Sequence, residues 1–208
     1  MFEENYKQIL SELTTNPQLP SQYVEEVKAQ HQKKGRYYHT FYHLESIWMQ
    51  LQPVKETISD WPVLVCAIAY HDFQYNTLKN DNEEKSALIA VKKLSVLQLN
   101  AEQITRCRQH ILATKGHQVS ADADTNYFTD ADLSILGADA ESYRSYANNI
   151  RKEYRYYPDL IYKPGRRKVL DFFLQMPRIF KTGHFFALYE SNARRNLAQE
   201  LLTLNDNS

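Results

Sequence analysis

The sequence is poor in glycine and cysteine and has no excess of charge of either sign. Only 5 of its 208 residues are glycine, which argues against a glycine-rich phosphate loop and against a turn-rich β fold. The 2 cysteines, Cys66 and Cys107, are too few for a disulfide framework, and we expect both to be reduced core residues. Because 25 basic residues balance 25 acidic ones, no strongly cationic surface for a nucleic acid polymer is indicated.

A signal peptide and a long apolar run are also missing. The first five residues, Met1 to Asn5, include two acidic residues and no basic or apolar leader region. The longest apolar run, Val63 to Tyr70, is far shorter than the roughly 20 residues that a membrane-spanning helix needs. We therefore expect a soluble, cytoplasmic protein without a membrane partner.

Helical periodicity runs through nearly the whole chain, and it predicts an all-α protein. We expect one domain over residues 1–208, a helical bundle of about eight or nine helices. The core motifs would occupy about 35–137, with C-terminal helices over 139–203 packed on them, and the tail 205–208 is expected to fray. Helical patterns occur over ten segments, slightly more than this count: 2–14, 21–32, 39–51, 61–71, 81–94, 101–112, a short segment from 129 or 130 to 137, 139–156, 165–175 and 184–203, with a long loop over 115–127.

His71 and Asp72 stand side by side at the end of the apolar run. A run this apolar is typical of a buried helix, and Asp60 followed by Pro62 is a good start for it. Burying an ionised carboxylate is costly unless its charge is compensated. A divalent metal ion would compensate Asp72, so the pair indicates a metal site if the chain supplies further ligands.

Further ligands are present in the sequence. His39 and His43 are four residues apart in one predicted helix, so both are expected on the same side of it. Asp130 and Asp132 lie near the start of another helix, and residues two apart on a helix point about 200° from each other, so only one is expected to reach an ion. Imidazole and carboxylate ligands suit Mn, Fe, Co, Ni, Zn or Mg and do not distinguish among them.

In this order and on helices, the motifs resemble the HD-domain superfamily of metal-dependent phosphohydrolases, and within it a small bacterial branch of HD phosphohydrolases. The resemblance covers about residues 35–200. A lone His-Asp pair would be weak support, whereas the ordered set is specific. The segments that carry the resemblance are Tyr38-His39-Thr40-Phe41-Tyr42-His43-Leu44-Glu45, Tyr70-His71-Asp72, Asp81-Asn82-Glu83-Glu84-Lys85-Ser86-Ala87, Ala113-Thr114-Lys115-Gly116-His117, Asp130-Ala131-Asp132-Leu133-Ser134-Ile135-Leu136-Gly137 and Ala193-Arg194-Arg195-Asn196-Leu197.

The resemblance implies a ligand set and a proton donor. The segment around Asp132 is similar to the one that supplies the last Asp ligand in cyclic-nucleotide phosphodiesterases, which are HD relatives. In those relatives the second His of His-x-x-x-His binds metal and the first protonates the leaving group, so His39 would be the proton donor or a phosphate contact. The implied metal ligands are His43, His71, Asp72 and Asp132.

Further catalytic and substrate-binding roles follow from the same resemblance and from residue chemistry. Glu83 would orient water or a ligand. Lys115 and His117 are, with His39, the candidates for stabilising charge on the phosphoryl group and for protonating the leaving oxygen. Some HD branches have a His beside this acid and bind a second metal; Asn82 stands there instead, so we expect one ion. The predicted phosphate-binding arginines are Arg36, Arg151, Arg166 and Arg194, and Tyr42 with its neighbours Tyr37, Tyr38 and Tyr75 would stack on a base.

Each of these residues also has an ordinary structural explanation. A His is often half-buried in a helix, acidic residues such as Glu83 favour a first helical turn, and Lys115 would simply be solvated. Arg194 lies in a helix rich in acidic and apolar residues, where an ion pair is the simpler use. The functional reading therefore depends on the whole set and not on any one residue.

The sequence therefore predicts a metal-dependent phosphohydrolase that acts on a small phosphate ester or a nucleotide, as a phosphomonoesterase or a phosphodiesterase. The alternative is a non-catalytic metal-containing module that binds a nucleotide or a signalling ligand. An oxidative di-iron enzyme of the same superfamily is a weaker third reading, because Asn82 argues against a second metal. The resemblance is also compatible with a homodimer.

Overall fold

The computed structural model describes residues 1–206, and its regular secondary structure in that range is entirely helical. The all-α prediction is confirmed, with ten α-helices and two 3-10 helices over residues 1–206 in place of the expected eight or nine. The predicted fraying of the tail concerns a segment whose end, 207–208, lies outside the described residues. In the described range, no helix is both long and apolar enough to cross a membrane.

The chain divides into two compact units, residues 1–131 and 132–208, and the division falls inside helix α7. The prediction of one domain stays a prediction. Unit 1 contains α1 (Phe2–Glu12), α2 (Leu19–His31), α3 (Phe41–Leu51), the 3-10 helix η1 (Gln52–Thr57), α4 (Trp61–Tyr70), α5 (Asn82–Leu94), α6 (Ala101–Ala113) and most of α7 (Ala123–Leu133). Unit 2 contains the 3-10 helix η2 (Ser134–Gly137), α8 (Ala140–Glu153), α9 (Asp159–Gln175) and α10 (Gly183–Asp206).

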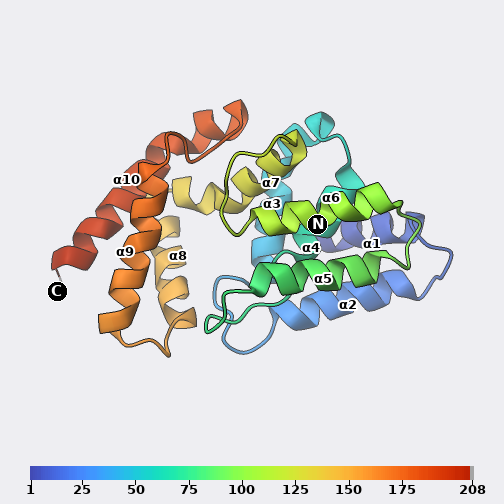
Figure 1. Ribbon diagram of the computed structural model, residues 1–208, viewed down its shortest axis with the longest axis horizontal. Coiled ribbons are helices and arrows are strands. Elements are labelled where there is room, and N and C mark those ends of the chain that lie inside the picture. The colour runs from blue at the N-terminus through green and yellow to red at the C-terminus, as the bar shows by residue number, and fades with distance from the viewer. Residues whose placement is uncertain (207–208) are drawn as a thin grey trace. The chain divides into compact units, whose positions relative to one another are not determined.

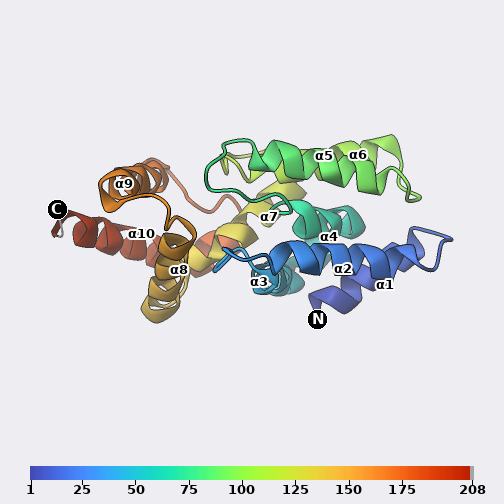
Figure 2. The same ribbon diagram turned by 90° about the horizontal axis from the view of Figure 1, so that it is seen from below.

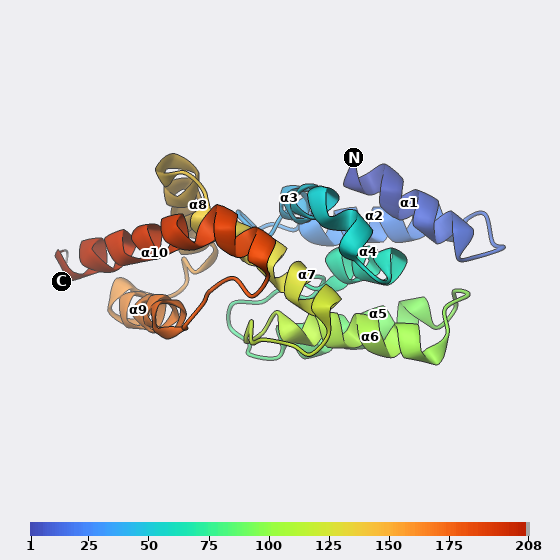
Figure 3. The same ribbon diagram turned by 90° about the horizontal axis from the view of Figure 1, so that it is seen from above.

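Helix α4 is the centre of unit 1. It lies between the layer formed by α1, α2 and α3 and the layer formed by α5 and α6, as two views show (Figures 2 and 3). Every residue from Val63 to Tyr70 is buried, which explains why this segment is apolar on all sides. Asp60 caps the helix by accepting a hydrogen bond from the Val63 backbone N–H, as predicted, and His71 is its C-cap residue.

Two predicted helix boundaries near the functional motifs are wrong. His39 lies in the bend before α3, which begins at Phe41. Helix α7 begins at Ala123, inside the predicted loop, because the Asp122 carboxylate accepts hydrogen bonds from the backbone N–H groups of residues 124 and 125. Asp132 therefore lies near the end of a helix and not at its start.

Unit 2 is built from α8, α9 and α10, with α9 and α10 side by side (Figure 1). The Asn196 amide on α10 donates hydrogen bonds to the carbonyl oxygens of Leu136 and Ala138 and so fixes η2 against this helix. Gly137 is required at the crossing, because a Cβ atom there would come within 2.5 Å of the Tyr189 Cβ and 2.6 Å of its carbonyl oxygen.

Candidate metal centre

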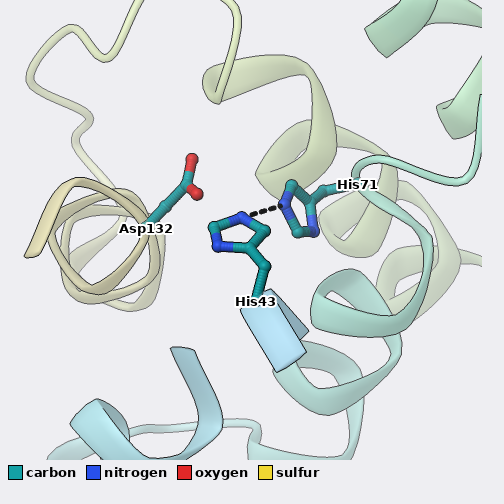
Figure 4. A group of neighbouring side chains, drawn as sticks. All are labelled: His43, His71 and Asp132. Atoms are coloured by element: carbon teal, nitrogen blue, oxygen red, sulfur yellow. Dashed lines mark hydrogen bonds between the residues drawn. The ribbon is translucent and has the colours of Figure 1, made fainter. Parts of the chain in front are cut away.

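Three of the predicted ligands converge on one point. His43 lies on α3, His71 follows α4 and Asp132 lies on α7, and their side chains point toward one another (Figure 4). One ligand atom from each lies within 4.8 Å of the others. Both imidazoles are buried, and Asp132 is half-buried. The group contains Asp132, which was the predicted choice over Asp130.

The local packing explains why these side chains meet. Phe128 lies one turn before Asp132 on α7, in the part of the helix that belongs to unit 1, and its ring packs edge-on against His71 at 5.6 Å. His110 Nδ1 on α6 is 2.7 Å from the Thr125 hydroxyl, which holds the same helix one turn earlier. The part of α7 that belongs to unit 1 is therefore held by buried contacts.

The tautomer of His71 follows from its neighbours. His71 Nδ1 lies 3.0 Å from the carbonyl oxygen of Ile68. A carbonyl oxygen can only accept, so Nδ1 carries a proton and donates it. In the neutral ring, Nε2 then offers a lone pair, and it lies 3.3 Å from His43 Nε2. Fixing the ring in this way is the usual task of an outer hydrogen bond in a histidine metal site.

Asp72 borders the group of three. Its Oδ2 atom is 3.0 Å from His71 Nε2 and 3.7 Å from His43 Nε2. Burial acts to raise the pKa of the Asp72 carboxyl. The surrounding imidazoles, first His71 and then His39, act in the opposite direction and outweigh burial, so the pKa lies well below its ordinary value. The carboxylate is therefore ionised at neutral pH. A lone pair and a carboxylate oxygen at such a distance repel unless a proton or a cation lies between them.

The spacing of the nitrogens fits a shared divalent ion. Two nitrogen ligands about 2.1 Å from one ion and about 100° apart lie about 3.2 Å from each other. His43 Nε2 and His71 Nε2 are separated by 3.3 Å. Together with the carboxylate of Asp132, they form a mixed N/O donor set of the kind that binds Mn, Fe, Co, Ni, Zn or Mg, and Asp72 as a further ligand stays a prediction. These donors do not fix the identity of the ion.

His39 lies beside the group although it precedes α3. Its ring is 5.7 Å from the His43 ring and 4.3 Å from the Tyr75 ring, and its Nε2 atom is 4.0 Å from Asp72 Oδ2. The Tyr38 ring lies 4.8 Å from the His43 ring. His39 is thus held by aromatic contacts, with a nitrogen near the carboxylate of a predicted ligand.

Arg36 joins the two ligand-bearing segments. Its guanidinium donates hydrogen bonds to the carbonyl oxygens of His39 at 2.9 Å, Asp72 at 2.7 Å and Phe73 at 3.1 Å. It also lies over the Tyr75 ring, 5.3 Å from its centroid. These contacts give Arg36 a structural task beside its predicted phosphate contact, because they tie the turn after α4 to the segment before α3.

The other predicted catalytic residues lie on α5 and in the loop after α6. Glu83 is half-buried in the first turn of α5, and burial raises the pKa of its carboxyl. Lys115 is exposed and forms an ion pair with Glu84 at 2.5 Å, a contact that raises the pKa of its ammonium group. His117 is half-buried and has a left-handed backbone, with φ 47°. The Asn82 side chain bonds the backbone of Asn76.

The predicted substrate-binding residues fall into two groups. Arg36 and Tyr42 belong to unit 1, and the Tyr42 side chain is 78% exposed. Arg151, Arg166 and Arg194 belong to unit 2. Arg166 is buried against Glu200, while Arg194 bonds Glu190 and the backbone after α9. Their substrate-binding role stays a prediction.

Sequence reasoning missed two contributors to this site. Phe128 received no role, although its ring positions His71. The structural task of Arg36 was also missed, because backbone carbonyl contacts between distant segments leave no pattern in a sequence. The start of α7 could have been found, since Ser120-Ala121-Asp122 is an N-cap signal.

Comparison with known proteins adds no assignment. The chain matches no model of a protein family and no curated protein sequence, so the likeness to the HD superfamily stays a prediction from its motifs.

Proposed function

We propose that the protein is a metal-dependent phosphohydrolase that acts on a small phosphate ester such as a nucleotide. The observation that carries this proposal is the convergence of His43, His71 and Asp132 within 4.8 Å, with the Asp72 carboxylate beside them. The resemblance of the ordered motifs to HD phosphohydrolases supports the choice of phosphate chemistry.

The chemistry requires an electrophile, a proton donor and a proton acceptor. When bound, a divalent ion supplies a Lewis acid that polarises a phosphoryl oxygen and makes water a stronger nucleophile near neutral pH. Water attacks phosphorus, the ester P–O bond breaks, and the leaving oxygen takes a proton. His39 is the proposed donor, because it lies beside the ligands and the aromatic contacts with Tyr38 and Tyr75 orient its ring.

Glu83 is the proposed acceptor for the proton that water releases. Burial raises the pKa of its carboxyl, which makes it a stronger base than an exposed glutamate. Lys115 is exposed, and its ammonium contacts the Asn80 carbonyl oxygen and the Glu84 carboxylate. We propose that it contacts the substrate phosphate only after this ion pair opens.

A turnover assay tests the activity. Purified protein loaded separately with Mn, Fe, Co, Ni, Zn or Mg is offered nucleotides and generic phosphate mono- and diesters, and product is followed by phosphorus NMR. We expect hydrolysis of at least one ester with at least one metal. Absence of turnover with every metal, in samples whose metal content is verified, would refute the enzymatic role.

Two variants then separate metal binding from proton transfer. We expect Asp72→Ala to lose most of the metal and the activity, because it removes a charge that balances the ion. His39→Ala should keep the metal and lower the rate by about 100- to 10,000-fold, the range for loss of a general acid. His184→Ala is the control for loss of an imidazole elsewhere. Equal metal loss in the first two variants would contradict this division of roles.

One observation favours the alternative, a metal-containing module that binds a nucleotide without hydrolysing it. Lys115, expected to stabilise charge on the phosphoryl group during transfer, is held in an ion pair with Glu84, and binding without turnover does not need that stabilisation. A nucleotide that raises the melting temperature and is recovered intact after hours with the metal-loaded protein would favour this module.

A further inference from the structure

Unit 2 contains a cavity of about 430 Å³ between α8, α9 and α10. Each helix contributes residues at a spacing of three and four, so one face of each helix lines the cavity. In a small helical bundle such faces normally carry large apolar residues that fill the centre. Here α8 contributes Tyr143, Arg144, Ala147, Asn148 and Arg151 instead, and the space between the helices stays open.

The charges around this cavity favour an anion. Arg144, Arg151 and Lys163 line it, together with the carboxylates of Asp159 and Glu200. Both carboxylates already accept hydrogen bonds from arginine side chains. Arg151 donates to Asp159 at 2.7 Å. Glu200 receives two hydrogen bonds from the buried Arg166 guanidinium, at 2.7 and 2.9 Å.

The Arg144 guanidinium, in contrast, is not paired with a carboxylate. Within residues 1–206, its exposed side chain makes no hydrogen bond or ion pair with another residue. Guanidinium groups bind phosphate or carboxylate oxygens bidentately. A cavity wall with an unpaired guanidinium beside paired carboxylates therefore presents net positive charge to a ligand.

The walls also offer flat apolar surface. Tyr143 and Tyr162 line the cavity, and the Arg151 guanidinium lies over the Tyr162 ring at 4.5 Å. Ala140 and Ala147 leave room between them and the neighbouring helices. The volume falls in the range of about 300–1,000 Å³ that is typical of small-molecule sites.

We propose that this cavity binds a small oxyanion with a flat apolar body, and that Arg144 is its principal anion contact. The ligand is of the size of a nucleoside monophosphate or an aromatic carboxylate, and both sources share this chemistry. The proposal concerns unit 2 alone and does not depend on a metal ion.

Calorimetric titration of metal-free, full-length protein tests it. The probes are adenosine monophosphate, 2-naphthoate, inorganic phosphate and uncharged adenosine. We expect at least one of the first two to bind with a dissociation constant below 1 mM, at least tenfold tighter than adenosine or phosphate alone. Whichever binds more tightly identifies the oxyanion as a phosphate or a carboxylate.

Two variants with matched controls locate the binding. Arg144→Gln should weaken it at least tenfold, whereas Arg195→Gln, an exposed arginine on α10 outside the cavity, should leave it unchanged. Ala147→Leu should block the cavity without changing charge, and Ala198→Leu on the exposed surface of α10 should not. Circular dichroism verifies that each variant is folded.

Three results would overturn the proposal. The first is no binding of either anion at 5 mM, a concentration about fivefold above the 1 mM limit. The second is adenosine binding as tightly as its monophosphate while naphthoate does not bind. The third is binding that survives both Arg144→Gln and Ala147→Leu, which would place the anion elsewhere on the protein.

Discussion

At the scale of single residues, the site depends on groups that fix the ligands without binding the ion. The Ile68 carbonyl oxygen sets the tautomer of His71, Phe128 packs against its ring, and Arg36 holds the turn that carries Asp72. Such outer contacts decide whether ligand atoms are preorganised. The metal affinity should therefore respond to residues that never touch the ion.

Replacement of Arg36 tests this dependence. A lysine ammonium lacks the planar fork that reaches three carbonyl oxygens, so Arg36→Lys should weaken metal binding by about 10- to 100-fold. Arg195→Lys is the matched control. Competition with a chromophoric chelator measures the affinity, and the visible absorption of the Co²⁺-loaded protein reports the ligand geometry. Unchanged affinity and absorption in Arg36→Lys would show that the clamp has no role in the site.

The buried side chain of His31 should make the stability of the fold depend on pH. Burial, and next the positive charge of Arg36, lower its pKa from 6.5 to about 3. Above pH 6.5 the imidazole is neutral in the folded and the unfolded chain. As the pH falls from 6.5 toward 3, only the unfolded chain binds the proton, so the free energy of unfolding decreases by at most about 1.4 kcal/mol per pH unit.

Denaturation of metal-free protein at pH 6.5 and 5.0 measures this change in the free energy of unfolding. Between these values His31→Met should lose roughly 1.6 kcal/mol less stability than the natural chain, because its side chain does not titrate. The comparison uses the change with pH within each protein, so a general loss of stability in the variant cancels. Equal losses in both proteins would show that folding does not lower the pKa of His31.

At the scale of elements, the helices follow from sequence where apolar and capping signals agree. Asp60 and the apolar run after it predict α4 and its end at His71. The predicted helix over 101–112 is α6, whose start is fixed by a capping box of Asn100 and Gln103. The prediction was wrong where signals compete. A short helix was expected to start at 129 or 130, yet Asp130 is buried inside α7, because Asp122 caps that helix earlier.

The candidate site was also predicted in part from the sequence. His43, His71 and Asp132 could be chosen from residue type, order and family resemblance, and the structure brings them together. The place of His39 outside α3 could not be predicted. The segment before the helix is shaped by the Arg36 bonds to Asp72 and Phe73 and by the Tyr75 ring beside His39, and these contacts join distant parts of the chain. Periodicity carries no information about such contacts.

Two glycines give an element-scale test in unit 2. Gly137→Ala should destabilise the protein by about 1–3 kcal/mol, because the added Cβ meets the Tyr189 backbone where η2 crosses α10. Gly165→Ala is the opposite case. It lies within α9 with nothing near the added Cβ, so it should stabilise by about 0.5–1 kcal/mol through helix propensity. Thermal unfolding of both variants measures the difference, and a neutral Gly137→Ala would contradict the close crossing.

At the scale of the whole molecule, the ligands tie together segments far apart in the sequence. His43, His71 and Asp132 come from three helices, α3, α4 and α7, and an ion bound to them stabilises the folded state. Metal loading at 100 times the dissociation constant should add about 2.7 kcal/mol. Hydrogen exchange should slow in these three helices, and exchange that is unchanged by metal would show that the ion binds elsewhere.

The most direct test of the account is elemental analysis of the natural chain and of Asp132→Ala, purified identically and exposed to the same six metals, followed by anomalous diffraction from crystals of the loaded protein. We expect about one equivalent of one metal in the natural chain and a large loss of metal in the variant. Anomalous density should lie in contact with His43 Nε2, His71 Nε2 and the Asp132 carboxylate. A natural chain that takes up no metal, or an Asp132→Ala protein that retains its full equivalent, would contradict it.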